Sequence, residues 1–425
     1  MSQNIQLMLA DFNQKLRLEP HNQDLYNNIA SLYYRIHQID NAIYYYQRSL
    51  NINPDNWQGH FNLANCYVQK NLVPDAIAHY QKSIQLNSEN IDAMQNLGML
   101  LVDTKNFSEA LPYLEKSFML QKTNQTHLEF IEQLANCYLQ LGNISKAIEH
   151  LQIAITVNPN QESAQHNLAI LYLREKDYIL AAKHFKIALQ LNPNNQTAKH
   201  MLHSITKENP SQPPTNYVAD LFDQYAAYYN LHVKKKLQYN LPEKFRSLYA
   251  KHATAITANN TLDLGCGTGL CGIYFRDASI NLIGIDISRN MLLHAKSSDY
   301  YDLLIQADLQ NQNIFKDNHF NLIIAADVLP YIGKLEDFFL KIKNALLKNN
   351  NSKNIFLFNI ELDDLKNNHK NLDFSLQTTG RYTHSIFYIE KLAKQFDFEI
   401  LENITDTIRL QDDKTVMGTI FVLSN

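Results

Sequence analysis

A short apolar run followed by three alternating glycines constrains the fold of this chain most. The run Thr261–Leu264 has the composition of a buried strand and carries an acid, Asp263, just before its end. Gly265, Gly267 and Gly269 follow it directly. Glycine permits left-handed backbone angles and leaves no side chain between a strand end and a ligand. The segment therefore predicts a strand that enters a tight, ligand-facing turn at the nucleotide-binding edge of an α/β sheet.

The spacing of these glycines indicates which class of nucleotide the turn suits. The dinucleotide fingerprint is G-x-G-x-x-G, and its third glycine would fall at a position where this chain has Leu270. The spacing here is G-x-G-x-G instead. A flavin or nicotinamide site and an ordinary strand-to-helix turn remain alternatives, although the acids that follow in the sequence make both less consistent with the whole segment.

Three further apolar runs also end in an acid. They end at Asp286, Asp308 and Asp327, as the first run does at Asp263. Asp286 lies beyond the glycines at roughly the 20-residue distance at which an acid reaches a ribose hydroxyl pair. The carboxyl ends of parallel strands line one crevice of a sheet. The four runs therefore predict a parallel sheet whose crevice is edged by carboxylates.

At these residues the chain resembles the class I S-adenosylmethionine-dependent methyltransferases. Their glycine segment is E/D-x-G-x-G-x-G, which the residues from Asp263 to Gly269 match. One position departs from the family, because Asn321 stands where these relatives often carry Asp. The resemblance implies a Rossmann-like α/β domain with a mostly parallel seven-stranded sheet, and S-adenosyl-L-methionine as the cofactor. The residues that it implies for cofactor binding are Asp263, Gly265, Cys266, Gly267, Gly269, Asp286, Ile287, Ala307, Asp308 and Tyr225.

Three other stretches resemble one subgroup of that superfamily. They are Tyr217–Pro242, Ala325–Gly333 and Thr379–Ser385. They are similar to the predicted methyltransferases that carry tetratricopeptide repeats and are related to the methyltransferase-like protein of the Williams-Beuren region. In the first stretch, Tyr225 and Tyr228 are expected to cover the cofactor, and the alternative is that they only pack their helix on the sheet.

Composition restricts the partners and the location that we expect. The 425 residues, 45% of them apolar, are enough for two or three domains with cores. A net charge of −4 gives no electrostatic drive toward nucleic acid, so no nucleic-acid partner is expected. The four cysteines lack zinc spacing, so we expect no metal site. With neither a signal peptide nor a membrane-spanning run, we expect a cytoplasmic protein without a membrane partner.

The N-terminal half is an array of a repeated unit. Each unit has the tetratricopeptide spacing, in which about 34 residues form two helices with small residues where the helices touch. About five full units align, and a short insertion near Gln125 to His127 interrupts them. The small residues at the equivalent contact position are Ala30, Ala64, Gly98, Ala135 and Ala169.

The repeats also predict where the domains begin and end. Residues 5–20 resemble the second helix of an incomplete leading repeat, and residues 197–207 resemble a closing helix over the last apolar face. The Pro-rich segment Asn209–Pro214 breaks the helical pattern. We therefore predict an all-α repeat superhelix over residues 1–207, a linker over 208–216 and the α/β methyltransferase domain over 217–425.

The sixth residue of each unit is a carboxamide that is expected to face the concave side of the superhelix. A carboxamide both donates and accepts, so a ladder of them can bind the backbone of an extended protein segment or peptide. The ladder resembles the one in O-GlcNAc transferase, although Asn is also common at this position of the repeat. The ladder residues are Asn28, Asn62, Asn96, Gln133 and Asn167.

The chemistry implied by the resemblance needs no obligatory catalytic residue. Methyl transfer from a sulfonium is an in-line displacement, so positioning and desolvation supply much of the acceleration. If the acceptor must lose a proton, the candidates in order of preference are His384, Tyr382, Tyr331 and Asp327. Arg381 and His384 are expected on the substrate side, where Arg381 suits an acidic group. The alternative is that both residues tie down a neighbouring strand.

Three functions remain open at this point. The favoured one is a methyltransferase whose repeat array recruits a protein, with that protein or a nearby metabolite as the unidentified methyl acceptor. The second is a scaffold or adaptor that binds the cofactor without turnover. The third is a nicotinamide oxidoreductase, which Leu270 disfavours. A DNA target is also disfavoured, because Asp327–Tyr331 lacks the Pro-Pro-Tyr of amino-methylating DNA enzymes and the net charge is acidic.

Overall fold

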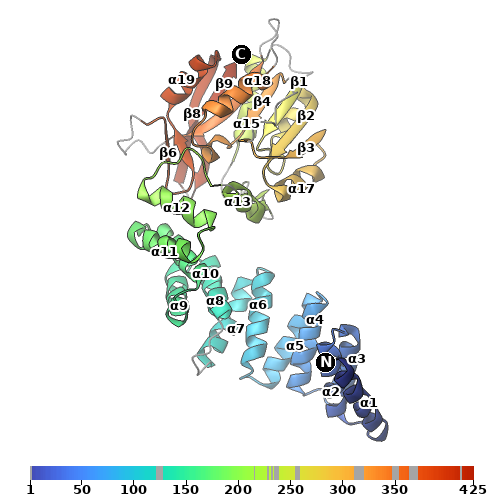
Figure 1. The fold of residues 1–425 in the computed structure, drawn as a ribbon. Helices are drawn as coiled ribbons and strands as arrows, with labels where there is room; N and C mark the ends of the chain where they lie inside the picture. The colour runs from blue at the N-terminus through green and yellow to red at the C-terminus, as the bar shows by residue number, and fades with distance from the viewer. Residues whose placement is uncertain are drawn as a thin grey trace. The chain divides into compact units, whose positions relative to one another are not determined.

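The chain forms two compact units, Met1–Glu175 and Lys176–Asn425 (Figure 1). The structure is a computed structural model. It describes residues 2–120, 128–214, 216–226, 229–230, 233, 239–253, 259–310, 320–346, 354–362, 372–411 and 414–425. The predicted insertion near Gln125 to His127 and the predicted cover residue Tyr228 lie outside these residues. The first compact unit ends at residue 175, whereas the repeat pattern of the sequence predicts that the array ends at residue 207. The boundary at 207 stays a prediction.

The first unit consists of helices that pack as consecutive pairs. Helix α2 packs on α3, α4 on α5, α6 on α7 and α8 on α9, while α1 packs on α2. The small residues Ala30, Ala64 and Ala135 are buried, as their position in the repeat predicts. The helices are α1 (Ser2–Leu18), α2 (Gln23–Arg35), α3 (Ile39–Ile52), α4 (Trp57–Gln69), α5 (Val73–Leu86), α6 (Ile91–Asp103), α7 (Phe107–Leu120), α8 (Leu128–Gln140), α9 (Ile144–Val157) and α10 (Glu162–Arg174).

Asparagines shape the ends of these helices. Asn22, Asn56 and Asn90 precede α2, α4 and α6, and their side-chain oxygens accept hydrogen bonds from N–H groups of the first turn. Asn53 and Asn87 follow α3 and α5, and each accepts from the N–H group two residues farther on. Part of the high asparagine content therefore serves helix ends and turns, which are positions distinct from the predicted ladder.

The second unit contains an α/β domain built on a seven-stranded sheet within the described residues. The strand order is β3-β2-β1-β4-β5-β9-β8. The pairs from β3 to β5 are parallel, whereas β9 runs antiparallel to both β5 and β8. A separate hairpin joins β6 and β7. The predicted fold class, a repeat superhelix followed by a Rossmann-like domain with a mostly parallel seven-stranded sheet, is confirmed.

Among the described residues of the second unit, four helices precede the first strand, and helices and strands mix from β1 onward. The helices and 3₁₀ turns are α11 (Tyr178–Leu191), α12 (Gln196–Thr206), α13 (Tyr217–Tyr225), α15 (Leu241–His252), α16 (Gly272–Phe275), η2 (Arg276–Ala278), α17 (Arg289–Ser297), η3 (Leu329–Tyr331), α18 (Glu336–Ala345) and α19 (Ile386–Gln395). The strands are β1 (Asn259–Leu264), β2 (Ser279–Asp286), β3 (Leu303–Gln306), β4 (Leu322–Ala325), β5 (Ile355–Glu361), β6 (Phe374–Leu376), β7 (Tyr382–His384), β8 (Glu399–Gln411) and β9 (Lys414–Ser424).

Helices cover both faces of the sheet (Figure 1). On β4, Ile323 and Ala325 belong to the core shared with α18 and α19, while Leu322 and Ile324 belong to the core shared with α15. Successive strand side chains point to opposite faces, so a strand buried on both faces is apolar at every position. This explains the uninterrupted apolar runs of the sequence, which turn polar only at the carboxyl edge of the sheet.

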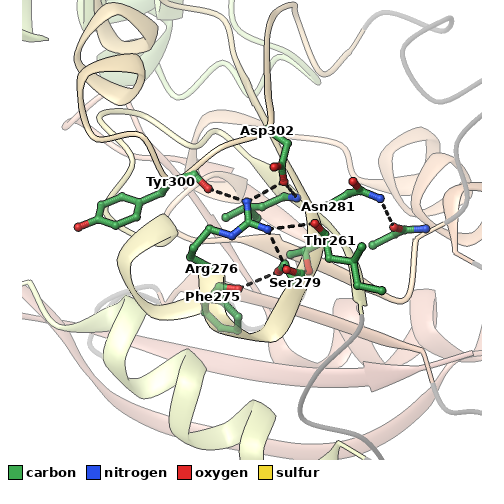
Figure 2. A network of polar contacts seen from close by, with 10 residues as sticks. Thr261, Phe275, Arg276, Ser279, Asn281, Tyr300 and Asp302 are labelled. Carbon is green, nitrogen blue, oxygen red and sulfur yellow. Dashed lines mark hydrogen bonds and ion pairs between the residues drawn. The ribbon is translucent and has the colours of Figure 1, made fainter.

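One arginine ties together the amino-terminal ends of β2 and β3 (Figure 2). The Nη1 atom of Arg276 donates to the Tyr300 carbonyl at 3.0 Å and to Asp302 Oδ2 at 2.6 Å, and its Nη2 atom donates to the Ser279 carbonyl at 2.8 Å. Asp302 also accepts from the Leu282 N–H at 2.7 Å. The guanidinium therefore holds the start of one strand against the turn that leads into its neighbour.

We predict that Arg276→Ala destabilises the second unit by about 1–2 kcal/mol, because several carbonyls and a carboxylate lose a charged donor together. The matched control is Lys391→Ala, which removes an exposed ion pair with Asp373 and is expected to cost about 0–1 kcal/mol. Urea denaturation of the full chain measures both. Equal midpoints for the two variants would show that the Arg276 network contributes no more than a surface pair.

Candidate functional site

A cavity of about 640 Å³ lies at the carboxyl edge of the parallel strands. Gly265 and Gly267 follow β1, Asp286 ends β2, Asp308 follows β3 and Asp327 follows β4, and all five residues line the cavity. Parallel strands end at the same edge of a sheet, so positions far apart in the chain become neighbours there. The crevice expected from the acid-terminated runs is therefore present as a cavity.

Asp286 is the most precisely held carboxylate of the cavity. It is only 7% exposed, and its Oδ1 atom accepts from the Ser288 N–H while its Oδ2 atom accepts from the Gly267 N–H, both at 2.8 Å. Burial raises the pKa of Asp286 to about 6, although these two hydrogen bonds oppose the shift. Each oxygen keeps a second lone pair, so the group can accept from a pair of ligand hydroxyls without losing its anchors.

The glycine turn leaves room for a ligand beside this carboxylate. Gly267 has φ +55°, and a Cβ built there would meet no atom closer than the Gly265 carbonyl oxygen at 4.0 Å. Ile287, Leu309 and Asp308 continue the wall past the ends of β2 and β3. Two apolar side chains and two carboxylates along this wall are groups that fit an adenosyl ligand, whose base is apolar and whose ribose carries two hydroxyl donors.

Asp263, the acid of the glycine motif, is absent from the lining of the cavity. It is 1% exposed, and its Oδ2 atom accepts from the Tyr301 hydroxyl at 2.6 Å. Burial raises the pKa of Asp263 to about 7, against the effect of that hydrogen bond. The motif acid is therefore bonded to Tyr301, a residue that sequence reasoning did not single out and whose ring lies beside Gly269 of the glycine turn.

Three other residues predicted at the cofactor are also absent from the lining and contribute through their backbones. The Cys266 N–H donates to the Ile285 carbonyl at 3.0 Å, the Gly269 N–H donates to the Cys266 carbonyl at 2.9 Å, and the Ala307 N–H donates to the Asp286 carbonyl at 3.0 Å. These bonds tie the glycine turn and the segment after β3 to the end of β2. Ile287 and Tyr225, in contrast, do line the cavity.

Two arginines and two carboxylates form an ionic group at the cavity, in which Arg381, Arg409 and Asp327 belong to the lining and Glu361 does not. Arg381 Nη2 lies 2.6 Å from Asp327 Oδ1 and also pairs with Glu361, while Arg409 pairs with Glu361 and lies 3.7 Å from Asp327 Oδ1. Arg381 also donates to the hydroxyl of Tyr331. The expectation that Arg381 pairs with an acidic substrate meets a physical obstacle, because two protein carboxylates already occupy its guanidinium.

The charges of this group depend on one another. Burial opposes ionisation of Glu361, but Arg381 and Arg409 outweigh it and lower the pKa of that carboxyl. Burial likewise opposes the charge of Arg381, and Asp327 and Glu361 overcome it and raise the pKa of Arg381. Glu361 and Arg381 therefore favour each other's charged forms, and the arginines fix the position of Asp327 at the cavity.

Sequence reasoning missed Glu361 and Arg409. Glu361 ends the apolar strand β5, so it carries the same signal as the acids after the first four runs and could have been found. Arg409 lies on the antiparallel strand β8, which is far from the glycine segment in sequence and has no motif of its own. Only the strand order of the folded sheet brings Arg409 to the cavity.

The structure does not bring His384 and Tyr382 to the cavity. His384 is 2% exposed and its Nε2 atom donates to the Gly333 carbonyl at 2.9 Å, while burial lowers its pKa to about 4. The Tyr382 ring is fully buried, and burial raises the pKa of its hydroxyl. Their placement matches the alternative in which this loop ties down neighbouring structure. Of the four catalytic candidates, Tyr331 and Asp327 line the cavity.

Aromatic side chains close the cavity on the side of α13. Tyr225 packs edge-to-face on Tyr229 with ring centroids 5.1 Å apart, and Phe222 packs on Tyr331 at 5.0 Å. Asp223 anchors this helix, because its Oδ1 atom accepts from the Ser288 hydroxyl and from the Asn290 N–H. The cover is therefore attached to the turn that follows Asp286. The cofactor role of Tyr225 stays a prediction.

The segment expected to be a linker is bound to the α/β domain over residues 208–214, which we call the strap. The Asn209 carboxamide donates to the Phe374 carbonyl and accepts from the Leu376 N–H, both at 2.9 Å, as a strand partner would. The Lys334 N–H donates to the Ser211 carbonyl at 2.8 Å. Gln212, Pro213 and Pro214 line the cavity.

Helix α12 anchors the strap at its start. His200 is fully buried, and its Nε2 atom donates to the Gly380 carbonyl at 2.8 Å. Its ring lies 4.2 Å from that of Tyr217, the first residue of α13, which is also buried. The predicted closing helix of the array, the strap and the first helix of the α/β domain therefore form one packed structure within the second unit.

The predicted carboxamide ladder occupies equivalent positions on the first helices of successive repeats. Asn28 and Asn167 are exposed, and Asn62 and Gln133 are half-buried, without a hydrogen bond to any described residue. Asn96 differs, because its Nδ2 atom donates to Asn65 at 3.1 Å. Four of the five carboxamides are therefore open to a ligand.

Comparisons with protein families identify the two parts of the chain. A methyltransferase domain family matches residues 262–350, and tetratricopeptide repeat families match residues 27–91, 101–169 and 163–195. The chain therefore contains a methyltransferase domain and tetratricopeptide repeats. These matches do not confirm the Williams-Beuren subgroup. No curated protein sequence matches the chain.

Several solved structures are similar to the repeats. YrrB, described as a TPR protein with an unusual peptide-binding site, is 22% identical with a TM-score of 0.42, and the match covers 44% of this chain and 96% of that one. MamA from Desulfovibrio magneticus RS-1 is 20% identical with a TM-score of 0.37, covering 41% and 96%. The APC/C hetero-tetramer Cut9-Hcn1 is 19% identical with a TM-score of 0.35, covering 48% and 40%.

Metal sites and membrane-spanning helices are two further features to consider among the described residues. No group of three or more His, Cys, Asp or Glu side chains arranged to hold a metal ion occurs among them. Of the helices in the described part of the chain, none combines the length and the apolar character that crossing a bilayer requires.

We predict that Gly333→Ala releases the strap. A Cβ at Gly333 would lie 2.6 Å from the Ser211 carbonyl oxygen, which is backbone and cannot rotate away, so the hydrogen bond from the Lys334 N–H must lengthen. Hydrogen exchange of the Lys334 amide is expected to accelerate about tenfold or more. The control Ser211→Ala keeps that carbonyl and changes only an exposed side chain. Unchanged exchange in Gly333→Ala would contradict the attachment.

Proposed function

We propose that this chain, which combines tetratricopeptide repeats with a methyltransferase domain, is an S-adenosyl-L-methionine-dependent methyltransferase whose repeats recruit a protein partner or substrate. The observation that carries the proposal is the carboxylate of Asp286, held by the Gly267 and Ser288 N–H groups at the edge of an open cavity. A carboxylate fixed beside a glycine turn at the switch point of a parallel sheet suits the ribose of a nucleoside ligand.

The residues around Asp286 indicate where the other parts of the ligand lie in this proposal. Asp286 accepts from the ribose hydroxyls, the base lies toward Ile287, Leu309 and Asp308, and the amino-acid end extends over the glycine turn. When bound, S-adenosyl-L-methionine supplies a methyl group on a sulfonium, which already has a good leaving group. The protein then has to bind, orient and keep out water.

The chain's own residues serve those tasks. The rings of Phe222, Tyr225 and Tyr331 and the prolines of the strap wall the cavity, and they exclude water from the reacting atoms. No histidine or lysine occurs among the described residues of the lining, and of the four catalytic candidates it includes Asp327 and Tyr331, which we propose contact the acceptor. Acceleration in this proposal therefore comes from positioning and desolvation.

The repeats supply the second half of the proposed function. The open carboxamides on the first helices suit the backbone of an extended protein segment or peptide, which they bind with little regard to its side chains. We also propose membership of the Williams-Beuren-related subgroup and a cytoplasmic location, both on the basis of the sequence patterns described above.

We predict that Asp286→Ala weakens S-adenosyl-L-methionine about tenfold or more, because two ligand hydroxyls lose a charged acceptor. The pKa of about 6 adds a pH dependence to the wild type. Above that pH the carboxylate accepts fully and the affinity stays level, whereas below it the carboxyl must lose a proton on binding and the affinity falls. Isothermal titration calorimetry with S-adenosyl-L-methionine, S-adenosylhomocysteine and NADH measures both effects.

The control for this titration is Asp277→Ala, an exposed aspartate outside the cavity. Unchanged affinity in Asp286→Ala would refute the ribose assignment. Binding of NADH alone would favour the nicotinamide alternative, and binding of no adenosyl ligand would refute the proposed cofactor. Binding of both adenosyl ligands without detectable transfer to any captured partner would favour the scaffold alternative.

We predict that Asn62→Ala combined with Asn167→Ala weakens capture of a protein partner about tenfold, because two free carboxamides lose their hydrogen bonds to the partner's backbone. S-adenosylhomocysteine affinity is expected to stay unchanged. Pull-down yield and titration calorimetry measure the two properties. Asn51→Ala, on the exposed surface of α3, is the control, and equal yields from all three proteins would refute the ladder.

A further inference from the structure

The chemistry of the acceptor end of the cavity follows from the order of the strands. Asp308, Asp286 and the glycine turn follow β3, β2 and β1, which are consecutive in the sheet, and β4 with Asp327 lies next to β1 on the other side. A ligand with its base toward Asp308 and its ribose at Asp286 therefore extends its sulfur toward Asp327. This step rests on the proposed function.

Asp327 is held at this place by an unusual backbone and by its neighbours. Its φ is +61°, a left-handed angle that costs energy in a non-glycine residue and that Asp and Asn tolerate better than most. Its N–H donates to Asn359 Oδ1 at 2.7 Å, and its Oδ1 atom lies 2.6 Å from Arg381. The second oxygen, Oδ2, has no hydrogen bond to a described residue and belongs to a side chain that lines the cavity.

The charge of the lining favours a cation at that oxygen. Three aspartates line the described part of the cavity against two arginines, and Glu361 and Asp327 already pair with both arginines. An acidic acceptor would therefore meet a negative wall without a free cation to receive it. Aromatic rings, among them Tyr229 and Tyr331, complete a lining that suits a positively charged group.

The lining also favours an amine over a hydroxyl as the methyl acceptor. A hydroxyl acceptor must lose its proton to a base as it reacts, and because the described lining has no histidine or lysine, it offers only carboxylates, which are weak bases, and tyrosines. An amine needs only to release one proton to water before it reacts. Its nitrogen lone pair then forms the N–C bond as the C–S bond breaks and leaves its electron pair on sulfur.

We propose that the methyl acceptor of this site is an amine, and that the Oδ2 atom of Asp327 accepts a hydrogen bond from its nitrogen. Asp327 positions the nitrogen in line with the methyl group and afterwards faces the methylammonium product. Arg381 and Arg409 keep this carboxylate in place and do not contact the acceptor.

Three adenosyl ligands test the proposal without a known acceptor. Sinefungin carries an amine where the cofactor carries its sulfonium methyl, so its ammonium takes the place of the methyl group and directs its N–H donors toward the acceptor's position. S-adenosyl-L-methionine carries positive charge there without an N–H donor, and S-adenosylhomocysteine carries neither. We expect the wild type to bind sinefungin about tenfold more tightly than S-adenosylhomocysteine, as one charge-assisted hydrogen bond provides.

The test variant is Asp327→Asn, since Asn also tolerates the left-handed backbone and keeps an oxygen for Arg381. We expect it to lose about tenfold in sinefungin affinity and less than about threefold for the other two ligands. Asp308→Asn is the matched control at the base end of the cavity, and it should weaken all three ligands by one factor. Thermal unfolding verifies that both variants fold.

Two results would overturn the amine assignment alone. One is the absence of a sinefungin preference in the wild type, which decides the question even if Asp327→Asn does not fold. The other is an equal loss of sinefungin and S-adenosyl-L-methionine in Asp327→Asn, which would assign the carboxylate to the sulfonium charge. Failure of all three ligands to bind the wild type would overturn the proposed function and this inference together.

Discussion

The buried pairing of Arg381 and Arg409 with Glu361 and Asp327 holds the second unit's cavity in shape. It joins the ends of β4 and β5 to the hairpin strand β7 and to β8, which are elements with no local reason to meet. Taking these charges out of water is costly, and losing one partner of a buried pair costs about 3–5 kcal/mol. The group therefore permits little variation in where Asp327 lies.

The strap, which precedes the predicted α/β domain in the sequence, forms part of the wall of its cavity. Asn209 replaces a strand in pairing with β6, Gly333 lets the backbone at Ser211 pass closely, and two prolines limit bending where the strap meets the cavity. His200 attaches the preceding helix to Gly380, so the end of the predicted array is bonded to the loop that carries Arg381, a residue of the cavity lining. Composition alone suggests a flexible linker here, since proline-rich segments are typical of linkers.

Local patterns predicted those parts of the site that lie on one short stretch of chain. The glycine turn and Asp286 follow from strand ends and backbone freedom, and the structure places Gly265, Gly267, Asp286 and Asp308 at one cavity. The order of preference among the catalytic candidates could not be predicted from such local patterns. His384 ranked first by its chemistry, but whether an imidazole faces a cavity or a carbonyl depends on packing that no local pattern records.

The sequence by itself determined the repeat array, the mostly parallel sheet and the edge of that sheet where a ligand fits. Those features depend on periodicity, glycine placement and the apolar content of single strands, all of which are local properties. Only the tertiary structure decided that Asp263 bonds to Tyr301 away from the cavity lining, that Arg381 is already paired, and that Arg409 reaches the cavity from β8. Contacts between strands that are distant in the sequence depend on the strand order of the folded sheet. The pairing of their side chains depends in turn on those contacts.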